Sequence, residues 1–209
     1  MARAGSIAGI AGVLAYFGAA FVPLPDSLTL LLAFAFGPLL GISFLGLFHL
    51  IAQHRDGPAL RFGVAFGLMA CVAVTTMLVV QVGNNMVLDS QLLAAESEAA
   101  KEAARQMHQS VNRVQYLIDV VWDIFITSAG ALVGWAMLRD PSFGRIWGGL
   151  GIVASVLLLY LNLDTFPRGP AYAGSVDLGP VVAVWFFAVY CRALWLSRAA
   201  SPVFRTAEM

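Results

Sequence analysis

Hydrophobic residues dominate six long stretches of the chain, and short polar segments separate them. Each stretch holds about 20 residues, the length that an α-helix needs to cross the hydrocarbon core of a bilayer. The stretches cover residues 6–24, 28–50, 61–83, 116–138, 144–163 and 178–197. Backbone polar groups in lipid must be satisfied within their own segment, so these continuous runs favour helices over strands. The pattern predicts an all-α bundle of six transmembrane helices, forming a single membrane domain over residues 1–209.

Residues 89–113 have a different pattern, rich in Ala, Glu, Gln, Lys and Arg and without Gly or Pro. This composition favours a helix, and we expect it to extend the third and fourth helices into the outer space as a stalk or hairpin. An alanine stripe recurs at four-residue spacing: Ala95, Ala99, Ala103 and Met107. Charged residues that can pair at helical spacing lie off this stripe: Glu98, Lys101, Glu102 and Arg105. The segment is either a solvated helix or a contact surface for a second copy or a partner in a membrane complex.

Composition supports the membrane assignment, because 60% of the residues are hydrophobic and only 11% are charged. A soluble domain carries about 25% charged residues. The first 20 residues are similar to a secretory signal peptide, with one Arg, an apolar stretch and small residues. Their apolar stretch is long for a signal peptide, and counting it as a helix orders the charges as described next.

The basic residues are distributed unequally between the two sides of the predicted bundle. With six spans both termini share one side, and that side collects Arg3, Arg55, Arg61, Arg139, Arg145, Arg192, Arg198 and Arg205. The other side has Lys101, Arg105, Arg113 and Arg168 together with most of the loop acids. The positive-inside rule therefore predicts a multi-pass protein of the cytoplasmic (inner) membrane with both termini cytoplasmic and an acidic outer face. The net charge of zero gives no reason to expect nucleic acid as a partner.

Glycine pairs at GxxxG spacing occur in most of the predicted helices. Such pairs let helix backbones approach closely in lipid. They are Gly5/Gly9, Gly37/Gly41, Gly63/Gly67, Gly130/Gly134 and Gly144/Gly148. We expect tight packing between helices and a surface for self-association, and we expect Pro38 to bend the second helix.

Two carboxylates, Asp119 and Asp123, lie four residues apart in the otherwise apolar run 116–138. On a helix they share a stripe with Tyr116, Thr127 and the glycine pair of that run, so the stripe should face the interior of the bundle. Counting back from Arg139 puts Asp119 at the outer boundary and Asp123 about 6 Å deeper. An ionisable residue at such a depth is a candidate functional residue.

Polar residues elsewhere in the chain match these carboxylates in depth. The third helix carries Gln81, Asn84 and Asn85 near its outer end, and Asn162 and Asp164 close the fifth. If the helices pack antiparallel, these groups converge near the outer surface. Three interpretations remain open: a structural polar cluster, a site that handles a cation, proton or small polar solute, and a catalytic site.

Other chemistry finds little support in the sequence. The three histidines are His49, His54 and His108, and neither they nor Cys71 and Cys191 form a metal or haem motif. Phosphate-binding, dinucleotide-binding and hydrolase motifs do not occur, so we expect no cofactor and no metal. The leading hypothesis is a non-enzymatic, channel-like or transporter-like protein with an acidic outer vestibule. The alternative is a structural or assembly subunit of a membrane complex, and the third is an uncharacterised membrane enzyme.

Residues 122–161, WDIFITSAGALVGWAMLRDPSFGRIWGGLGIVASVLLLYL, join a small-residue helix, an Arg- and Pro-containing turn and a Gly-rich helix start. This segment resembles a broad class of uncharacterised bacterial six-helix integral membrane proteins, a domain-of-unknown-function class. The resemblance implies the same six-helix count and a bacterial membrane. It implies no particular catalytic or binding residue.

Overall fold

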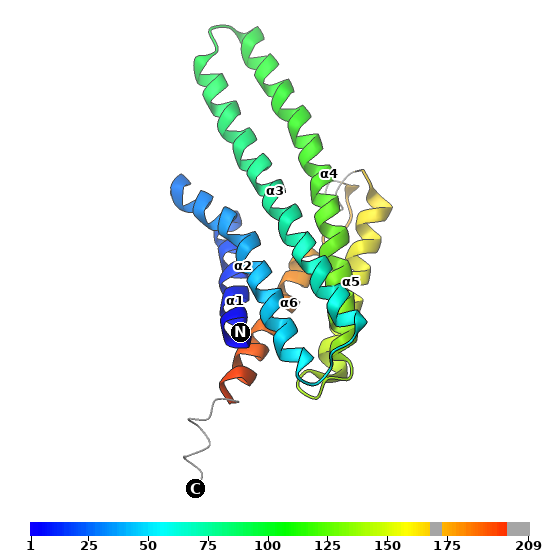
Figure 1. The fold of residues 1–209 in the computed structure, drawn as a ribbon. Coiled ribbons are helices and arrows are strands. Elements are labelled where there is room, and N and C mark those ends of the chain that lie inside the picture. Colours follow the sequence, from blue (N-terminus) through cyan, green and yellow to red (C-terminus); the bar gives the residue numbers. More distant parts are fainter. Residues whose placement is uncertain (168–172, 200–209) are drawn as a thin grey trace.

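The computed structural model describes residues 1–167 and 173–199 (Figure 1). Within them the chain forms six α-helices and no β-strand, as the hydrophobic pattern predicts. The helices are α1 Ala2–Phe21, α2 Asp26–Ala52, α3 Pro58–Ala94, α4 Glu98–Met137, α5 Gly144–Thr165 and α6 Gly179–Ala199. All six are long and apolar enough to cross a membrane.

The helices form a closed ring in which each packs against the next in the chain and α6 returns to α1. The start of α1, the end of α6 and the loops 53–57 and 138–143 lie at one end of the bundle (Figure 1). The α3–α4 turn lies at the opposite end (Figure 1). We call these the termini end and the hairpin end. Because α1 passes through the whole bundle, its last turns lie near the hairpin end.

Helices α3 and α4 continue far beyond the other four as a two-helix extension, residues 84–113 (Figure 1). They hold 37 and 40 residues, which is about 55–60 Å of helix and roughly twice the hydrocarbon thickness of a bilayer. The turn at 95–97 separates them, and the Ser97 hydroxyl caps α4 by accepting a hydrogen bond from the backbone N–H of Ala100 at 3.2 Å. Residues 89–113 therefore form the tip and second arm of a hairpin.

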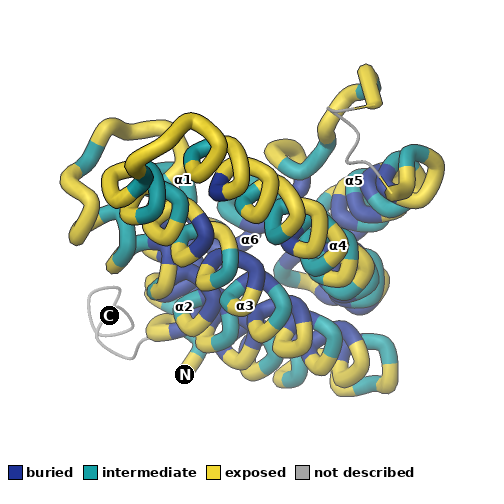
Figure 2. The backbone as a smooth tube through the Cα atoms, turned by 90° about the horizontal axis from the view of Figure 1, so that it is seen from above, coloured by how far each residue is buried: buried dark blue, intermediate teal, exposed yellow. Residues whose placement is uncertain are grey.

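The outer surface of the bundle is apolar, whereas its polar side chains tend to point inward. Large apolar residues are more than half exposed on several helices, for example Val72 on α3, Trp135 on α4 and Ile146 on α5. Figure 2 shows the buried segments where the helices turn toward one another and the exposed segments around them. Helix α2 continues through Pro38 and is bent, with its N-terminal part leaning away from the bundle (Figure 1).

Helices α4 and α5 meet backbone to backbone at Gly134 and Gly148. A Cβ placed on Gly134 would lie 2.8 Å from the carbonyl oxygen of Gly148, and one on Gly148 would meet the Gly134 carbonyl in turn. One turn further along, Gly130 admits the Ser155 hydroxyl of α5. Gly144 does not share this contact, in contrast to the expectation. It begins α5 with φ +74°, and an added Cβ there would meet no described atom within 4 Å, so its role is in the turn.

Other glycines of the predicted pairs also lie at helix contacts. A Cβ on Gly63 would lie 3.0 Å from the Val133 side chain of α4, and one on Gly67 would lie 2.6 Å from the Phe44 ring of α2. Gly5 of α1 faces Gly46 of α2, a partner that the GxxxG search does not identify. Small residues thus let several pairs of neighbouring helices approach closely.

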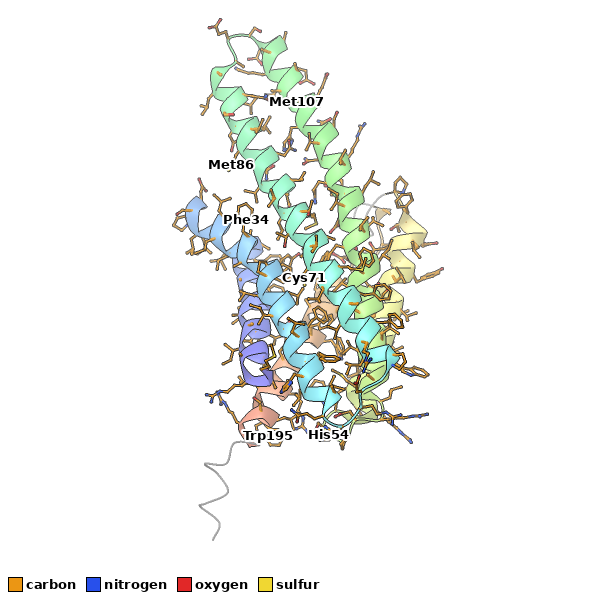
Figure 3. The ribbon with its side chains drawn as sticks, viewed as in Figure 1. Phe34, His54, Cys71, Met86, Met107 and Trp195 are labelled. Carbon is orange, nitrogen blue, oxygen red and sulfur yellow. The ribbon has the colours of Figure 1, made fainter. Side chains whose placement is uncertain are left out.

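Polar contacts join three elements at the termini end. Asp140 is 1% exposed, and one of its carboxylate oxygens accepts hydrogen bonds from the backbone N–H groups of Ser142 (2.8 Å) and Phe143 (3.3 Å). Its other oxygen lies 3.5 Å from Nδ1 of His54, after the end of α2. Arg192 of α6 donates to the Ser142 carbonyl at 3.0 Å. These contacts fix the α4–α5 turn, and His54 and Trp195 mark this end in Figure 3.

Candidate functional site

A cavity of about 250 Å³ lies between α1, α2, α4, α5 and α6. It is near the hairpin end of the bundle, because it is lined by the last turns of α1, the middle of α4, the last turns of α5 and the start of α6. Its walls are mostly apolar. Aromatic rings make up much of them: Tyr16, Phe17, Phe21, Phe36, Tyr116, Trp122 and Phe186. The Tyr16 and Phe36 rings pack with centroids 5.0 Å apart.

Asp119 and Asp123 both line this cavity. They lie one turn apart on α4, so the helix presents both to the same side, as the stripe predicts. Asp119 is partly buried, whereas Asp123 is only 8% exposed. The backbone carbonyl of Asp123 accepts a hydrogen bond from Thr127. Its carboxylate has no hydrogen-bond or ion-pair partner within residues 1–167 and 173–199.

The charged side chains among the described residues that line the cavity are all acidic. A third carboxylate, Asp177, precedes α6 and lines the same cavity, and no Lys, Arg or His stands among the described lining residues. Burying an ionised carboxylate without a counter-charge costs several kcal/mol. Among the described lining residues no basic group supplies a counter-charge to Asp123, and a bound cation or a proton on the carboxyl group would remove this cost.

A second cavity, also about 250 Å³, lies on the other side of Asp119. Helices α3 and α4 supply most of its wall, which is rich in amides: Gln81, Asn85, Asn112 and Gln115. Asp119, Tyr16 and Tyr116 line both cavities, so the two are neighbours. The amide-rich cavity can admit water and small polar solutes, and the aromatic one lies beside it.

Some of the polar residues that were predicted to converge near Asp119 and Asp123 lie beside these carboxylates, and others do not. Gln81 and Asn85 share a cavity with Asp119, and Asn162 shares the other with both carboxylates of α4. Asp164 is exposed and lines neither cavity. It lies two residues after the buried Asn162 and therefore on the opposite side of α5.

Asn84 also lies away from the carboxylates, in the hairpin extension. Its amide nitrogen donates to the His108 carbonyl at 3.0 Å and to Oδ1 of Asn112 at 2.9 Å. Asn85 contacts His108 as well, through its Oδ1 and the Nε2 of the ring at 2.9 Å. Asn84 points from α3 toward α4, where it meets its two hydrogen-bond partners, whereas the next residue, Asn85, lines the amide-rich cavity. Its role is to join the two arms of the hairpin.

The alanine stripe of the extension faces away from this joint. Ala99, Ala103 and Met107 are exposed, whereas Ala104 is the buried residue of that helix segment. The expected ion pairs form along the same arm, Lys101 with Glu98 at 2.8 Å and Arg105 with Glu102 at 3.6 Å. Met86 and Met107, labelled in Figure 3, mark the extension.

Several lining residues could not be identified from the sequence as site residues. Tyr16 lies inside an apolar run, and Asp177 is one acid among several in the loops. Trp122 lines the cavity beside Asp123, although no spacing rule singles it out. The one signal available for Asp177 was its place directly before the predicted helix 178–197.

Comparison of the chain with protein-family models, with curated proteins and with solved structures finds no match in any of the three.

Proposed function

We propose that this chain is a multi-pass protein of a bacterial cytoplasmic membrane, with both termini in the cytoplasm and the α3–α4 extension outside. Six apolar helices with apolar outward faces support membrane insertion. The charge distribution supports the orientation, because seven described arginines belong to the termini end: Arg3, Arg55, Arg61, Arg139, Arg145, Arg192 and Arg198. Arg168 and Arg205, which the sequence assigns to opposite sides, lie outside the described residues. The resemblance of residues 122–161 to bacterial six-helix membrane proteins supports the choice of a bacterial membrane.

Within this membrane protein we propose a non-enzymatic cation-binding vestibule that opens from the outer side and admits a cation or a small polar solute. The observation that carries the proposal is the Asp123 carboxylate, which is 8% exposed, lines a cavity and has no described partner. A bound cation supplies the missing counter-charge without deforming the helices. The amide-lined cavity next to Asp119 supports a polar route to this site.

Cation-dependent thermal stability tests the proposal. A ligand that binds the folded state alone raises stability as its concentration exceeds Kd, by about 2.7 kcal/mol at a hundredfold excess. Wild-type protein in nanodiscs should melt at a higher temperature as the ligand cation is added at constant ionic strength. Asp123→Asn should fold and lose this response, and Asp164→Asn, which removes an exposed carboxylate at the same end, should keep it. An Asp123→Asn variant with an undiminished response to every cation would refute the proposal.

Arg168 is a second counter-charge candidate by sequence, because it follows Asn162 closely. The variant Arg168→Gln distinguishes a counter-charge from this arginine from a counter-charge supplied by a bound cation. We expect this variant to keep the cation response. If Arg168→Gln instead destabilises the protein as strongly as removing the cation does, the vestibule holds an internal ion pair and the proposal is wrong.

A second candidate function, assembly with another copy or a partner protein, is favoured by the extension. Large apolar side chains on it are exposed: Met86, Val87, Leu93 and Met107. In an extension outside the membrane these residues would face water, so contact with another chain would stabilise them. If residues 89–113 mediate assembly, Ala99→Glu should lower the oligomer fraction in mild detergent and leave the helix content unchanged. An unchanged oligomer distribution would indicate that the segment is a solvated helix without a partner chain.

A further inference from the structure

We propose that the ligand of the aromatic cavity is an organic ammonium cation with an apolar body. This inference rests on the proposed function and narrows it, from any cation to one chemical class. Three properties of the described cavity carry it: a buried carboxylate without a partner among the described residues, a wall of aromatic rings, and described carboxylates too dispersed to form a metal site.

The carboxylate recognises the charge. Asp123 is the most deeply buried acid of the cavity, and Asp119 and Asp177 add negative charge from α4 and from the segment before α6. No described basic residue lines the wall, so the potential inside the cavity attracts cations and repels anions.

The walls recognise the rest of the ligand. Aromatic faces attract alkylammonium groups through their quadrupole, and Trp and Tyr do so best. Tyr16, Tyr116 and Trp122 supply such rings near the carboxylates, and phenylalanines complete the wall. A volume of about 250 Å³ corresponds to roughly eight water molecules, which suits a compact amine rather than a lipid tail or a peptide.

The same cavity is poorly suited to a bare metal ion. Calcium takes six to eight oxygen ligands, and magnesium holds an octahedral shell. In the described part of the chain, no three His, Cys, Asp or Glu side chains gather closely enough to hold a metal ion. A diffuse organic cation does not need such a shell, because one carboxylate neutralises its charge and rings contact its carbon atoms.

An ammonium group can reach the cavity as a free amine or as the headgroup of an ethanolamine or choline lipid. The chemistry at Asp123 is shared, but a headgroup also brings a phosphate, for which the described lining has no basic partner. Binding measured in nanodiscs of phosphatidylglycerol, with and without added phosphatidylethanolamine, distinguishes the two sources.

The decisive experiment uses benzyltrimethylammonium as the probe and isothermal titration calorimetry of the full chain in phosphatidylglycerol nanodiscs. The proposal expects saturable binding of the probe that is at least about tenfold tighter than binding of Na⁺ or Ca²⁺, because each tenfold step needs only one good cation–π contact. If phosphatidylethanolamine competes with the probe, the headgroup is the ligand source. If it does not, the source is a free amine. Either result keeps the ammonium assignment.

Matched variants locate the binding site. Asp123→Asn should weaken binding of the probe at least about tenfold, since it removes a charge-assisted contact, while Asp164→Asn should not change it. Trp122→Leu should weaken it about three- to thirtyfold, while Trp135→Leu, an exposed tryptophan outside the cavity, should have no effect. If Asp123→Asn does not fold, two measurements still test the proposal: the preference of the wild type for the probe over Na⁺ and Ca²⁺, and the difference in probe affinity between Trp122→Leu and Trp135→Leu.

Failure of this inference is distinguishable from failure of the proposed function. If Na⁺ or Ca²⁺ stabilises the wild type through Asp123 and the probe does not bind, the vestibule stands and the ammonium assignment is wrong. If the probe binds with equal affinity to wild type, Asp123→Asn and Trp122→Leu, it does not occupy this cavity and the inference is overturned. If no cation of any class binds, both proposals fail.

Discussion

Two adjacent glycines of α5 offer a sharp test of how the bundle packs. Gly148 faces α4, and an added Cβ there would meet the Gly134 carbonyl and lie 2.8 Å from the backbone nitrogen of Leu138. Gly149 is the next residue, and an added Cβ would meet no described atom within 4 Å. The substitution to alanine is chemically the same at both positions, so a difference between them reports only the helix contact.

The expected magnitudes follow from two opposing terms. Alanine in place of glycine inside a helix gains roughly 0.5–1 kcal/mol, and this gain applies to both variants. Overpacking costs about 1–3 kcal/mol, and it applies to Gly148→Ala alone because its two nearest new contacts are backbone atoms that cannot rotate away. Gly149→Ala should therefore be neutral or stabilising, and Gly148→Ala should be less stable than it by about 1–3 kcal/mol.

Thermal unfolding in one detergent, followed by helix content, measures the difference. For a chain of this size about 1 kcal/mol corresponds to roughly 2–4 °C, so the two variants should melt about 2–12 °C apart. Equal melting temperatures would mean that α4 and α5 do not make this backbone contact, and Gly149→Ala melting below Gly148→Ala would refute the packing outright.

Three further predictions concern other parts of the molecule. In a cysteine-free background, Glu96→Cys at the hairpin tip should react with an impermeant thiol reagent added outside intact cells, whereas Gln53→Cys at the termini end should react only after lysis; the reverse pattern would invert the proposed orientation. Arg61 holds the pKa of the Asp56 carboxyl below its usual value, because the guanidinium donates two hydrogen bonds to the carboxylate at 2.9 and 2.7 Å. The small contribution of this pair to stability should therefore be present above the unfolded-state pKa of Asp56. It should be lost as the pH falls through the folded-state pKa. Titration of Asp56 by NMR should show that Arg61→Gln returns the pKa to its ordinary value, and an unchanged pKa would refute the pairing. Asn84→Leu should destabilise the hairpin by about 1–3 kcal/mol through the acceptors it leaves unpaired, measured by faster amide hydrogen exchange in that segment, and unaltered exchange would show that the bond does not hold the arms together.

The helices could be predicted from the sequence because a membrane-length apolar run has few alternative structures. The inward direction of Asp119 and Asp123 could be predicted too, since helical periodicity places both on the stripe of small residues. The register between α3 and α4 could not. This register decides that Gln81 shares a cavity with Asp119 while Asn84 contacts His108 and Asn112 of α4, and it depends on packing along the whole pair.

The aromatic cavity could not be predicted from the sequence either, for a related reason. Tyr16 and Phe36 come from runs that are apolar throughout, so nothing in their pattern distinguishes a residue facing a cavity from one facing a neighbouring helix. Gly144 shows the complementary error. Its spacing from Gly148 is that of a packing pair, but a turn that needs positive φ uses it instead.

The most direct measurement of the central claim is the reactivity of Asp123 toward a hydrophobic carbodiimide, with the modified residue identified by mass spectrometry. A buried carboxyl group without a partner, facing a cavity, is open to this reagent, and a bound cation would shield it. We predict that Asp123 is modified in the absence of ligand and that saturating benzyltrimethylammonium, or whichever cation raises the melting temperature, slows its modification at least about tenfold. Modification of Asp123 at the same rate with and without every cation tested would contradict the claim that this carboxylate is a cation ligand.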